Sequence, residues 1–223
     1  MNQKTVLYDN FTAADSANWV ASDGWANGSP FWVGWTSDQV SYSANHLKIQ
    51  LDDTGCPNSC SDEDYASGEL QSLDTFGEGT FQVSLKAVKA DGVVTAFFLY
   101  TGASEGTIHD EIDIEFLGKD TTQVQFNYFV DSVGGHEEVI DLGFDASLAL
   151  HTYTIRRTAT SIIWSVDGVA KHSVTATAAA PLPQSDLKVI LNFWAGTGVD
   201  SWLNAFSYTS TLEAQFEWVR VLQ

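Results

Sequence analysis

Three acidic residues at alternate positions form the part of this sequence best suited to chemistry. Glu111, Asp113 and Glu115 alternate with apolar residues in the run 109–118. Because successive side chains of a β-strand point to opposite faces, a strand here would place all three carboxylates on one face. Their mutual repulsion is costly, and an ordinary core would not tolerate it. The row therefore predicts a functional site on one face of a strand.

The two glutamates of this row have the chemistry of a nucleophile and a general acid/base. At about 3.3 Å per residue, the Cα atoms of Glu111 and Glu115 would lie about 13 Å apart. On a bent strand, their long side chains could bring the carboxyl groups to the ~5 Å spacing of a retaining glycosidase. One glutamate would attack an anomeric carbon, and the other would protonate the departing oxygen and then deprotonate water. Asp113 would raise the pKa of the acid and hydrogen-bond to the nucleophile.

Two other interpretations of the row are a calcium site and a solvated strand face. Calcium ions favour loop ligands and backbone carbonyl groups, whereas this row alternates with the β-branched residues Ile112 and Ile114. Catalysis is the interpretation that the residue types favour.

The elements that must position this row are β-strands. Alternation of apolar and polar residues recurs along the chain, and helical periodicity is scarce. Asp167-Gly168 is a typical two-residue hairpin turn, so 161–174 is predicted to form two strands. Further strands are predicted at 81–86, 93–100, 123–130, 151–156, 187–194 and 213–221.

The chain has no linker, tandem repeat or long charged block that would divide it. The run 175–183, rich in alanine and proline, is predicted to be a loop that is too short to separate domains. Many strands with turns between them are typical of a sandwich. We therefore expect an all-β fold in which residues 1–223 form a single domain of two antiparallel sheets.

The composition restricts the partners. The formal net charge is −19, from 29 acidic and 10 basic side chains. Such a field repels nucleic acid, anionic lipid and polyanionic polymers, although acidity also serves simply to keep a secreted protein soluble. No apolar run approaches the ~18 residues of a membrane span. The 8 tryptophans exceed the usual need of such a core and favour carbohydrate, whose flat C–H faces stack on aromatic rings.

The two cysteines, Cys56 and Cys60, lie in one short segment. Two thiols cannot form a four-ligand zinc site unaided. In an oxidising compartment we expect a disulfide that pins this loop rather than stapling the fold. We expect a secreted protein. Because the first residues lack the apolar stretch of a signal peptide, we expect that this peptide has been removed.

The run Glu111-Ile-Asp-Ile-Glu115 matches the catalytic motif of glycoside hydrolase family 16. The longer run 110–122 resembles the bacterial licheninases (1,3-1,4-β-glucanases) of that family. The resemblance implies a β-jelly-roll sandwich with a long concave cleft. It continues over nearly the whole chain, in the segments 22–28, 68–71, 124–128, 133–137, 141–147, 192–194 and 196–202.

This resemblance implies a role for each residue of the site. Glu111 would be the nucleophile, Glu115 the acid/base and Asp113 the assisting residue. Amides of the cleft would hydrogen-bond to sugar hydroxyls and indoles would stack on sugar rings, although each tryptophan could instead pack in the core. The implied substrate contacts are Trp25, Asn27, Phe31, Glu69, Gln71, His109, Asn127, Phe129, Asn192, Trp194 and Trp202.

Four positions depart from typical licheninases of the family. Those proteins have Trp at the position of His109, Arg at that of Gln71, and Tyr at those of Trp25 and Phe129. Gln71 and His109 resemble instead the family's bacterial exopolysaccharide glycanases, which cut succinoglycan-type polymers. No extra residue separates the two glutamates, which keeps the chain with the licheninase-like branch. His109 would either hydrogen-bond in the cleft wall or modulate activity at acidic pH through its charge.

Two further family features concern positions outside the cleft. Licheninases often carry a disulfide whose equivalent positions here are Val33 and Ser67. Calcium often braces these folds, partly through an aspartate that corresponds to Glu217, whose longer carboxylate could still bind the ion. We expect no cofactor to be required for catalysis, and a structural calcium ion is an option.

The leading hypothesis is hydrolysis of a neutral mixed-linkage β-1,3-1,4-glucan, such as lichenan or cereal β-glucan, with retention. One alternative is depolymerisation of an exopolysaccharide such as succinoglycan, against which the net charge argues. Another is transglycosylation, in which a sugar replaces water as acceptor. A non-catalytic lectin would gain nothing from three crowded acids. The expected partner is a β-glucan polysaccharide, with no nucleic acid and no membrane, and we expect a monomer.

Overall fold

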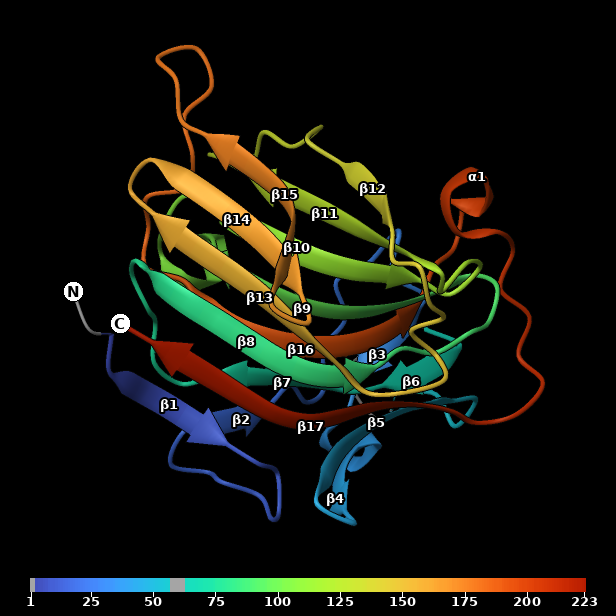
Figure 1. Ribbon diagram of the computed structural model, residues 1–223. Coiled ribbons are helices and arrows are strands. Elements are labelled where there is room, and N and C mark those ends of the chain that lie inside the picture. The colour runs from blue at the N-terminus through green and yellow to red at the C-terminus, as the bar shows by residue number, and fades with distance from the viewer. Residues whose placement is uncertain (1–2, 57–62) are drawn as a thin grey trace.

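Two β-sheets are stacked face to face in the computed structural model, which describes residues 3–56 and 63–223 (Figure 1). One sheet has seven strands in the order β12-β11-β10-β9-β16-β7-β2. The other has ten, with a central path β15-β14-β13-β8-β17-β5-β6-β3, to which β1 adds at β17 and β4 at β5. This is the expected β-jelly-roll sandwich.

The seven-stranded sheet carries the site and consists of β2 (Trp19–Ala21), β7 (Glu69–Ser72), β9 (Val93–Thr101), β10 (Asp110–Leu117), β11 (Gln123–Phe129), β12 (Glu138–Asp141) and β16 (Lys188–Ala195). The ten-stranded sheet consists of β1 (Thr5–Asp9), β3 (Val33–Trp35), β4 (Val40–Ser43), β5 (His46–Asp52), β6 (Tyr65–Ser67), β8 (Gly79–Lys86), β13 (His151–Thr158), β14 (Ser161–Val166), β15 (Val169–Thr175) and β17 (Leu212–Leu222). The helical turns are η1 (Ser37–Gln39), η2 (Ala103–Glu105) and α1 (Asp200–Leu203).

Every strand predicted from alternation is present, with ends that differ by a few residues at most. The hairpin turn is confirmed, because Asp167 and Gly168 have φ values of 48° and 78°, as a two-residue hairpin with matched twist requires. The described strand pairs are antiparallel, as expected, except at one place, where β3 pairs with β6 in parallel. Parallel neighbours need a long crossover, and the excursion through β4 and β5 supplies it.

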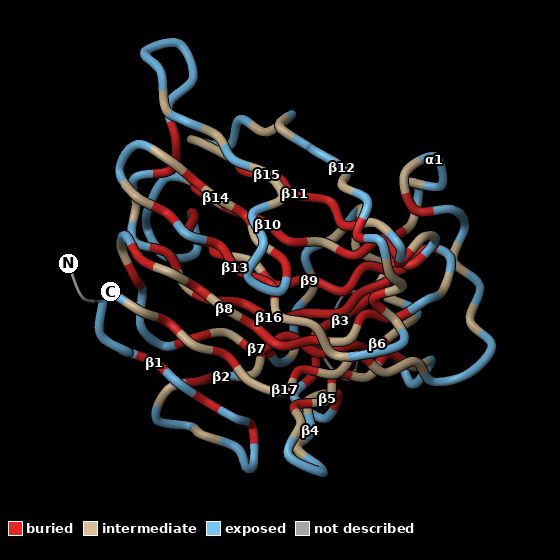
Figure 2. Tube along the Cα trace, in the orientation of Figure 1, coloured by how far each residue is buried: buried red, intermediate tan, exposed pale blue. Residues whose placement is uncertain are grey.

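The strand with the acidic row has two different faces. Ile112, Ile114 and Phe116 are fully buried between the sheets, where the buried segments in Figure 2 are concentrated. The opposite face therefore turns its carboxylates away from the core. From the other sheet, the indole of Trp164 crosses the core and donates to the backbone carbonyl of Asp113 at 3.0 Å. This bond ties the strand to the layer behind it.

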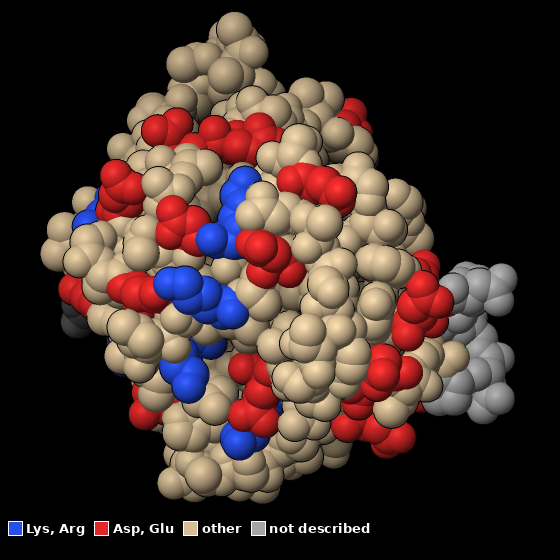
Figure 3. Space-filling model, turned by 90° about the vertical axis from the view of Figure 1, so that its right-hand side faces the viewer, with Lys and Arg blue, Asp and Glu red and all other residues tan. Residues whose placement is uncertain are grey.

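Acidic side chains outnumber basic ones, with 29 against 10 in the whole chain. On the face seen in Figure 3, Asp and Glu are widely spread, while the Lys and Arg side chains gather in one part of it. A polyanion approaching this face would meet mostly carboxylates. Within residues 3–56 and 63–223, no helix is long and apolar enough to cross a membrane. That residues 1–223 form a single domain remains a prediction. The strand order is compatible with it, because each sheet takes strands from early and late parts of the chain.

Candidate active site

A cleft with a volume of about 1040 Å³ lies over the outer face of the seven-stranded sheet. Its walls come from β7, β9, β10, β11 and β16 and from the loops around them. The structure brings every predicted catalytic and substrate-contact residue together in this cleft: Trp25, Asn27, Phe31, Glu69, Gln71, His109, Glu111, Asp113, Glu115, Asn127, Phe129, Asn192, Trp194 and Trp202.

Strand register explains how residues distant in the sequence reach the same cleft. In β10, Glu115 lies opposite Gln125 of β11 and opposite Ala96 of β9. Ala96 in turn lies opposite Asn192 of β16, which lies opposite Glu69 of β7. One row across five strands thus carries four polar side chains and a single small one. The methyl group of Ala96 leaves the space beside Glu115 open.

Glu115 has a raised pKa, which favours its neutral form. Burial first, and then the negative charges of Glu111 and Glu137, raise the pKa of Glu115 to about 7, against a lowering hydrogen bond from Gln125. That bond runs from Gln125 Nε2 to Glu115 Oε2 at 2.7 Å. Trp202 fixes the amide, because its indole donates to Gln125 Oε1 at 3.1 Å. A carboxyl group that holds a proton near neutral pH suits a general acid.

Asp113 is buried between the two glutamates, with an exposed fraction of 4%. Burial, followed by the charges of Glu111 and Glu115 and a hydrogen bond to Glu111, raises the pKa of Asp113 well above its usual range. Its protonated carboxyl group can therefore donate to Glu111. Asp113 is equipped to assist a neighbouring carboxylate rather than to attack a substrate itself.

Glu111 is held by donors. Nε2 of His109 lies 2.5 Å from Oε2 of Glu111, and Asp113 supplies the second hydrogen bond. These two hydrogen bonds fix the orientation of the Glu111 carboxylate, as a nucleophile requires. Glu115 differs in being bonded by an amide and in having a raised pKa. The two glutamates thus have different partners, which suits them to different roles.

Glu69 anchors a polar cluster at one wall of the cleft. Ser22 Oγ and Gln71 Nε2 donate to Glu69 Oε1 at 2.7 and 2.8 Å, and Asn192 Nδ2 donates to Oε2 at 3.0 Å. Burial is the main effect that raises the pKa of Glu69. Asn192 Oδ1 is buried, and among the described residues it has no hydrogen-bond partner. A sugar hydroxyl entering the cleft could donate to that oxygen.

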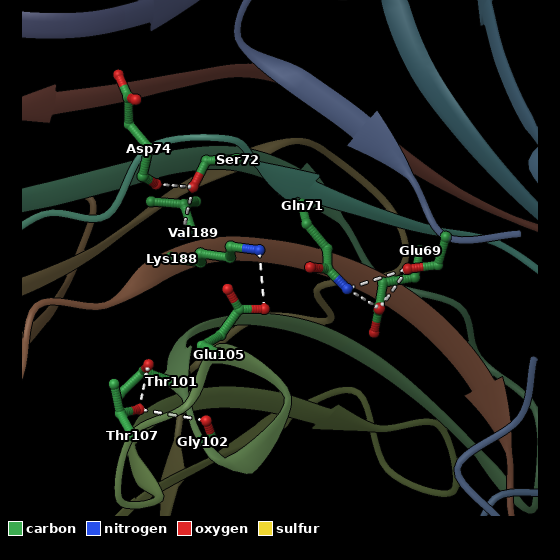
Figure 4. A network of polar contacts seen from close by, with 11 residues as sticks. Glu69, Gln71, Ser72, Asp74, Thr101, Gly102, Glu105, Thr107, Lys188 and Val189 are labelled. Carbon is green, nitrogen blue, oxygen red and sulfur yellow. Dashed lines mark hydrogen bonds and ion pairs between the residues drawn. The ribbon is translucent and has the colours of Figure 1, made fainter.

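Gln71 and Glu105 also line the cleft, and Glu105 forms an ion pair. Lys188 Nζ of β16 lies 3.0 Å from Oε1 of Glu105, which belongs to η2. Figure 4 shows this pair beside Gln71, whose amide is directed toward Glu69. Lys188 therefore balances the charge of Glu105, which lines the cleft.

The aromatic residues differ in what they offer to a sugar. Trp194 is only 3% exposed, because Phe31 packs against it with ring centroids 4.2 Å apart and Trp202 lies at 5.9 Å. Trp25 is 39% exposed and meets Trp35 edge to face. The alternative of core packing therefore holds in large part for Trp194, whereas Trp25 presents open surface. Both still border the cleft.

The two remaining predicted asparagines have their carbonyl oxygens engaged by the protein. Oδ1 of Asn27 accepts from the indole of Trp35 at 2.5 Å, and Oδ1 of Asn127 accepts from the backbone N–H of Tyr128 at 2.9 Å. These bonds fix the orientation of each amide, so that the NH₂ group is the end suited to a sugar oxygen.

Sequence reasoning missed eight residues that also line the cleft. Four of them lie on predicted strands. Two of these four are two positions away from a predicted site residue and share its strand face, so the period-two pattern carried the signal for them. The other four lie in connecting segments, where periodicity gives none. The strand residues are Phe98, Tyr100, Gln125 and Ile190, and the others are Pro30, Ser104, Glu105 and Glu137.

The expectations outside the cleft have different outcomes. Val33 and Ser67 occupy the positions of the family disulfide. Val33 is fully buried in the core, and the hydroxyl of Ser67 donates to the backbone carbonyls of Gln50 and Phe193. The predicted bridge between Cys56 and Cys60 lies partly outside the described residues, because Cys60 is not among them.

Glu217, the predicted calcium ligand, lies on β17. Ser84 Oγ donates to Glu217 Oε2 at 2.8 Å. In the described part of the chain, no group of three or more His, Cys, Asp or Glu could hold a metal ion. Calcium ions require six to eight oxygen ligands. The calcium role of Glu217 therefore stays a prediction.

Two glutamates and a buried aspartate on one strand face of a cleft are suited to the hydrolysis of a glycosidic bond. The model of the glycosyl hydrolases family 16 matches residues 27–220. The chain belongs to this family.

Similar proteins and solved structures agree with this family assignment. A β-glucanase of Paenibacillus polymyxa is 44% identical over 96% of this chain and 87% of its own length, and one of Bacillus subtilis (strain 168) is 42% identical over 96% and 85%. The crystal structure of a prokaryotic β-1,3-1,4-glucanase (lichenase) from a mouse hindgut metagenome superposes with a TM-score of 0.91, at 40% identity over 96% of this chain and 97% of that one. The structure of a Bacillus licheniformis β-glucanase superposes with a TM-score of 0.88, at 39% identity over 99% of this chain and 98% of that one.

Proposed function

We propose that this protein is a retaining endo-β-glucanase that hydrolyses mixed-linkage β-1,3-1,4-glucan by double displacement. The observation that carries the proposal is the pair Glu111 and Glu115 on one face of β10 in an open cleft, where Glu111 is held by His109 and the pKa of Glu115 is raised to about 7. Its relatives named β-glucanase and lichenase support the substrate. An open cleft lets a polymer chain lie across the site, so internal bonds are cleaved.

In the first step Glu111 attacks the anomeric carbon while Glu115 gives its proton to the departing oxygen. The glycosidic bond breaks and an ester forms between the sugar and Glu111. Asp113, protonated and hydrogen-bonded to Glu111, holds the nucleophile in place. Asn192 Oδ1 and the amides of the cleft are available to orient sugar hydroxyls.

In the second step Glu115, now ionised, takes a proton from water, and the water oxygen attacks the same carbon. The bond between the sugar and Glu111 breaks, and its electron pair returns to the carboxylate. Two displacements on one carbon restore the original configuration. The product is therefore the β-anomer.

The pH dependence of kcat/KM should reflect Glu115. The first step requires its protonated form, and the pKa of Glu115 is raised to about 7. Activity should therefore persist below that pH and fall as the pH rises through it, by about tenfold per unit in the limit of a single group. Initial rates on barley β-glucan across pH 5–9 measure this. A fall that begins near pH 4.5, the ordinary range of a glutamate, would contradict it.

Hydrolysis should proceed with retention. Proton NMR of the first products should show the β-anomer before mutarotation produces the α-anomer. An initial α signal would indicate inversion, in which water attacks directly and no ester forms on Glu111. The double displacement would then have to be abandoned.

Mixed-linkage glucan should be cleaved far better than a pure β-1,3 or pure β-1,4 glucan. A bent chain of mixed linkages fits a cleft that straight cellulose does not, so discrimination should appear mainly in kcat/KM. The measurement compares barley β-glucan, lichenan, laminarin, carboxymethylcellulose and succinoglycan by the oligosaccharides released. Faster cleavage of laminarin or succinoglycan would overturn the licheninase assignment and leave only the class of reaction.

We further propose that the protein acts outside the cell as a monomer. Its polymeric substrate cannot cross a membrane, and its cleft is complete within one chain. Activity in the culture medium of the source organism, compared with washed cells, tests the location. Light scattering coupled to gel filtration tests the monomer, and a dimer mass would contradict it.

A further inference from the structure

His109 immediately precedes β10, and its imidazole reaches the carboxylate of Glu111. The distance from Nε2 to Oε2 is 2.5 Å. A carboxylate oxygen can only accept a hydrogen bond, so Nε2 carries the proton. Unlike an amide or indole donor, an imidazole that donates here can also carry a positive charge.

The imidazole is held by the neighbours of the nucleophile. It stacks on Phe129 with ring centroids 5.1 Å apart and an angle of 19°, and it lies 5.3 Å from Tyr100. Phe129 and Tyr100 are the residues opposite Glu111 in β11 and β9. The backbone carbonyl of His109 also accepts from the N–H of Ser132 at 2.9 Å. The donor and the carboxylate are thus fixed by one set of contacts.

The contact is partly shielded from water. The side chain of His109 is 27% exposed and that of Glu111 is 19% exposed. A charge-assisted hydrogen bond is stronger there than at an open surface. The pair is nevertheless open to the cleft, where the substrate must reach Glu111.

The groups that face the imidazole favour its protonated form. On its own segment these are Glu111 and Asp110, while β9 presents Tyr100 and β11 presents the uncharged Phe129. The hydrogen bond to Glu111, and then the charges of Glu111 and Asp110, raise the pKa of His109 against the opposing effect of burial. The carboxylate of Asp110 is fixed in turn by three backbone N–H groups.

The charge on Glu111 changes during the reaction, and a hydrogen bond from His109 responds to it. The carboxylate is charged before the attack and neutral as an ester in the glycosyl-enzyme. It regains its charge while the bond to the sugar breaks in the second step. A donor that binds the charged form more strongly lowers the barrier of that second step. His109 keeps its proton throughout, because Glu115 performs both proton transfers.

We propose that His109 is a positioning residue that holds Glu111 for attack and stabilises its carboxylate as it leaves the sugar in the second step. This rests on the proposed function, in which Glu111 is the nucleophile. A residue that merely lined the cleft wall would affect substrate binding and would not favour one chemical step over the other.

The test separates the two steps with a dinitrophenyl β-glycoside of a mixed-linkage oligosaccharide. The burst of dinitrophenol reports the first step, and the steady rate that follows reports the second. His109→Phe keeps a ring between Phe129 and Tyr100 but removes the donor. His109→Gln keeps an N–H donor without the charge. His172→Gln, on β15 of the other sheet, is the matched control.

His109→Phe should slow the steady rate by at least about tenfold more than the burst, the scale of a lost hydrogen bond to a charged group. The glycosyl-enzyme should then accumulate and be visible in the intact protein mass. His109→Gln should keep the burst and show a smaller loss in the steady rate. His172→Gln should match the wild type. Equal slowing of both steps, or an effect on KM alone, would overturn the proposal.

Two further measurements keep the result interpretable. Melting temperatures show whether either variant is folded, and His109→Gln remains informative if His109→Phe is not. In the wild type, a 2-deoxy-2-fluoro glycoside should trap an ester, which peptide mapping should locate on Glu111. An ester on another residue would refute the proposed function itself, whatever the His109 variants do.

Discussion

Replacing Glu111 with alanine is expected to reduce hydrolysis of barley β-glucan by more than about 10⁴-fold, beyond what a general acid supplies. No other group on β10 can take its place, because Asp113 is buried and favours its protonated form. The core face of the strand is unchanged, so the fold should persist. Release of reducing ends measures the activity, and circular dichroism checks the fold. The exposed Glu78→Ala, outside the cleft, is the matched control.

Azide should restore part of the activity of Glu111→Ala. A small anion can occupy the cavity left by the carboxylate and attack the anomeric carbon from the same side. The product should be an α-glycosyl azide, because only one displacement occurs. An aryl glycoside with a good leaving group makes the rescue measurable by NMR or mass spectrometry. Wild-type turnover in the alanine variant, or a β-glycosyl azide from it, would show that Glu111 is not the nucleophile.

Replacing Glu115 with alanine should cost about 10²–10⁴-fold on the polymer, the usual contribution of a positioned acid/base. The loss in the first step should be much smaller for a dinitrophenyl glycoside, whose leaving group needs no proton. The fall of kcat/KM above pH 7 should also disappear for that substrate, because the group that titrates there has been removed.

Azide distinguishes the second role from the first. In Glu115→Ala the nucleophile Glu111 still forms the glycosyl-enzyme, and azide then displaces it from the opposite side. The product should therefore be a β-glycosyl azide, the mirror of the outcome at Glu111. If the polymer and the dinitrophenyl glycoside lost activity by the same factor, Glu115 would not be the acid.

The sequence predicted most of the site because alternation in strands is a local property. The spacing of Glu111, Asp113 and Glu115 was enough to place them on one face of a strand. The strand containing Phe98 was also predicted, but alternation alone does not say which of its two faces meets the cleft. That choice depends on the pairing of β9 with β10 and β16, which is a tertiary property.

Loops and short strands escaped prediction for a different physical reason. Glu105 and Glu137 reach the cleft from segments whose path is set by tertiary packing, and no periodicity marks them. The strands β2, β3 and β6 have three residues each, too few for an alternating pattern to be recognised. The contact between His109 and Glu111 was not predicted either, since a residue one position before a strand has no fixed direction.

The hydrogen bond from the Trp164 indole to the backbone of Asp113 makes the activity of this enzyme depend on the packing of its two sheets. The donor belongs to one sheet and the acceptor to the strand that carries both glutamates in the other. Separation of the layers would release β10 from its support, so no partly opened form should remain active. Inactivation, measured by residual activity, and global unfolding, measured by the summed fluorescence of the 8 tryptophans, should then share one midpoint in urea.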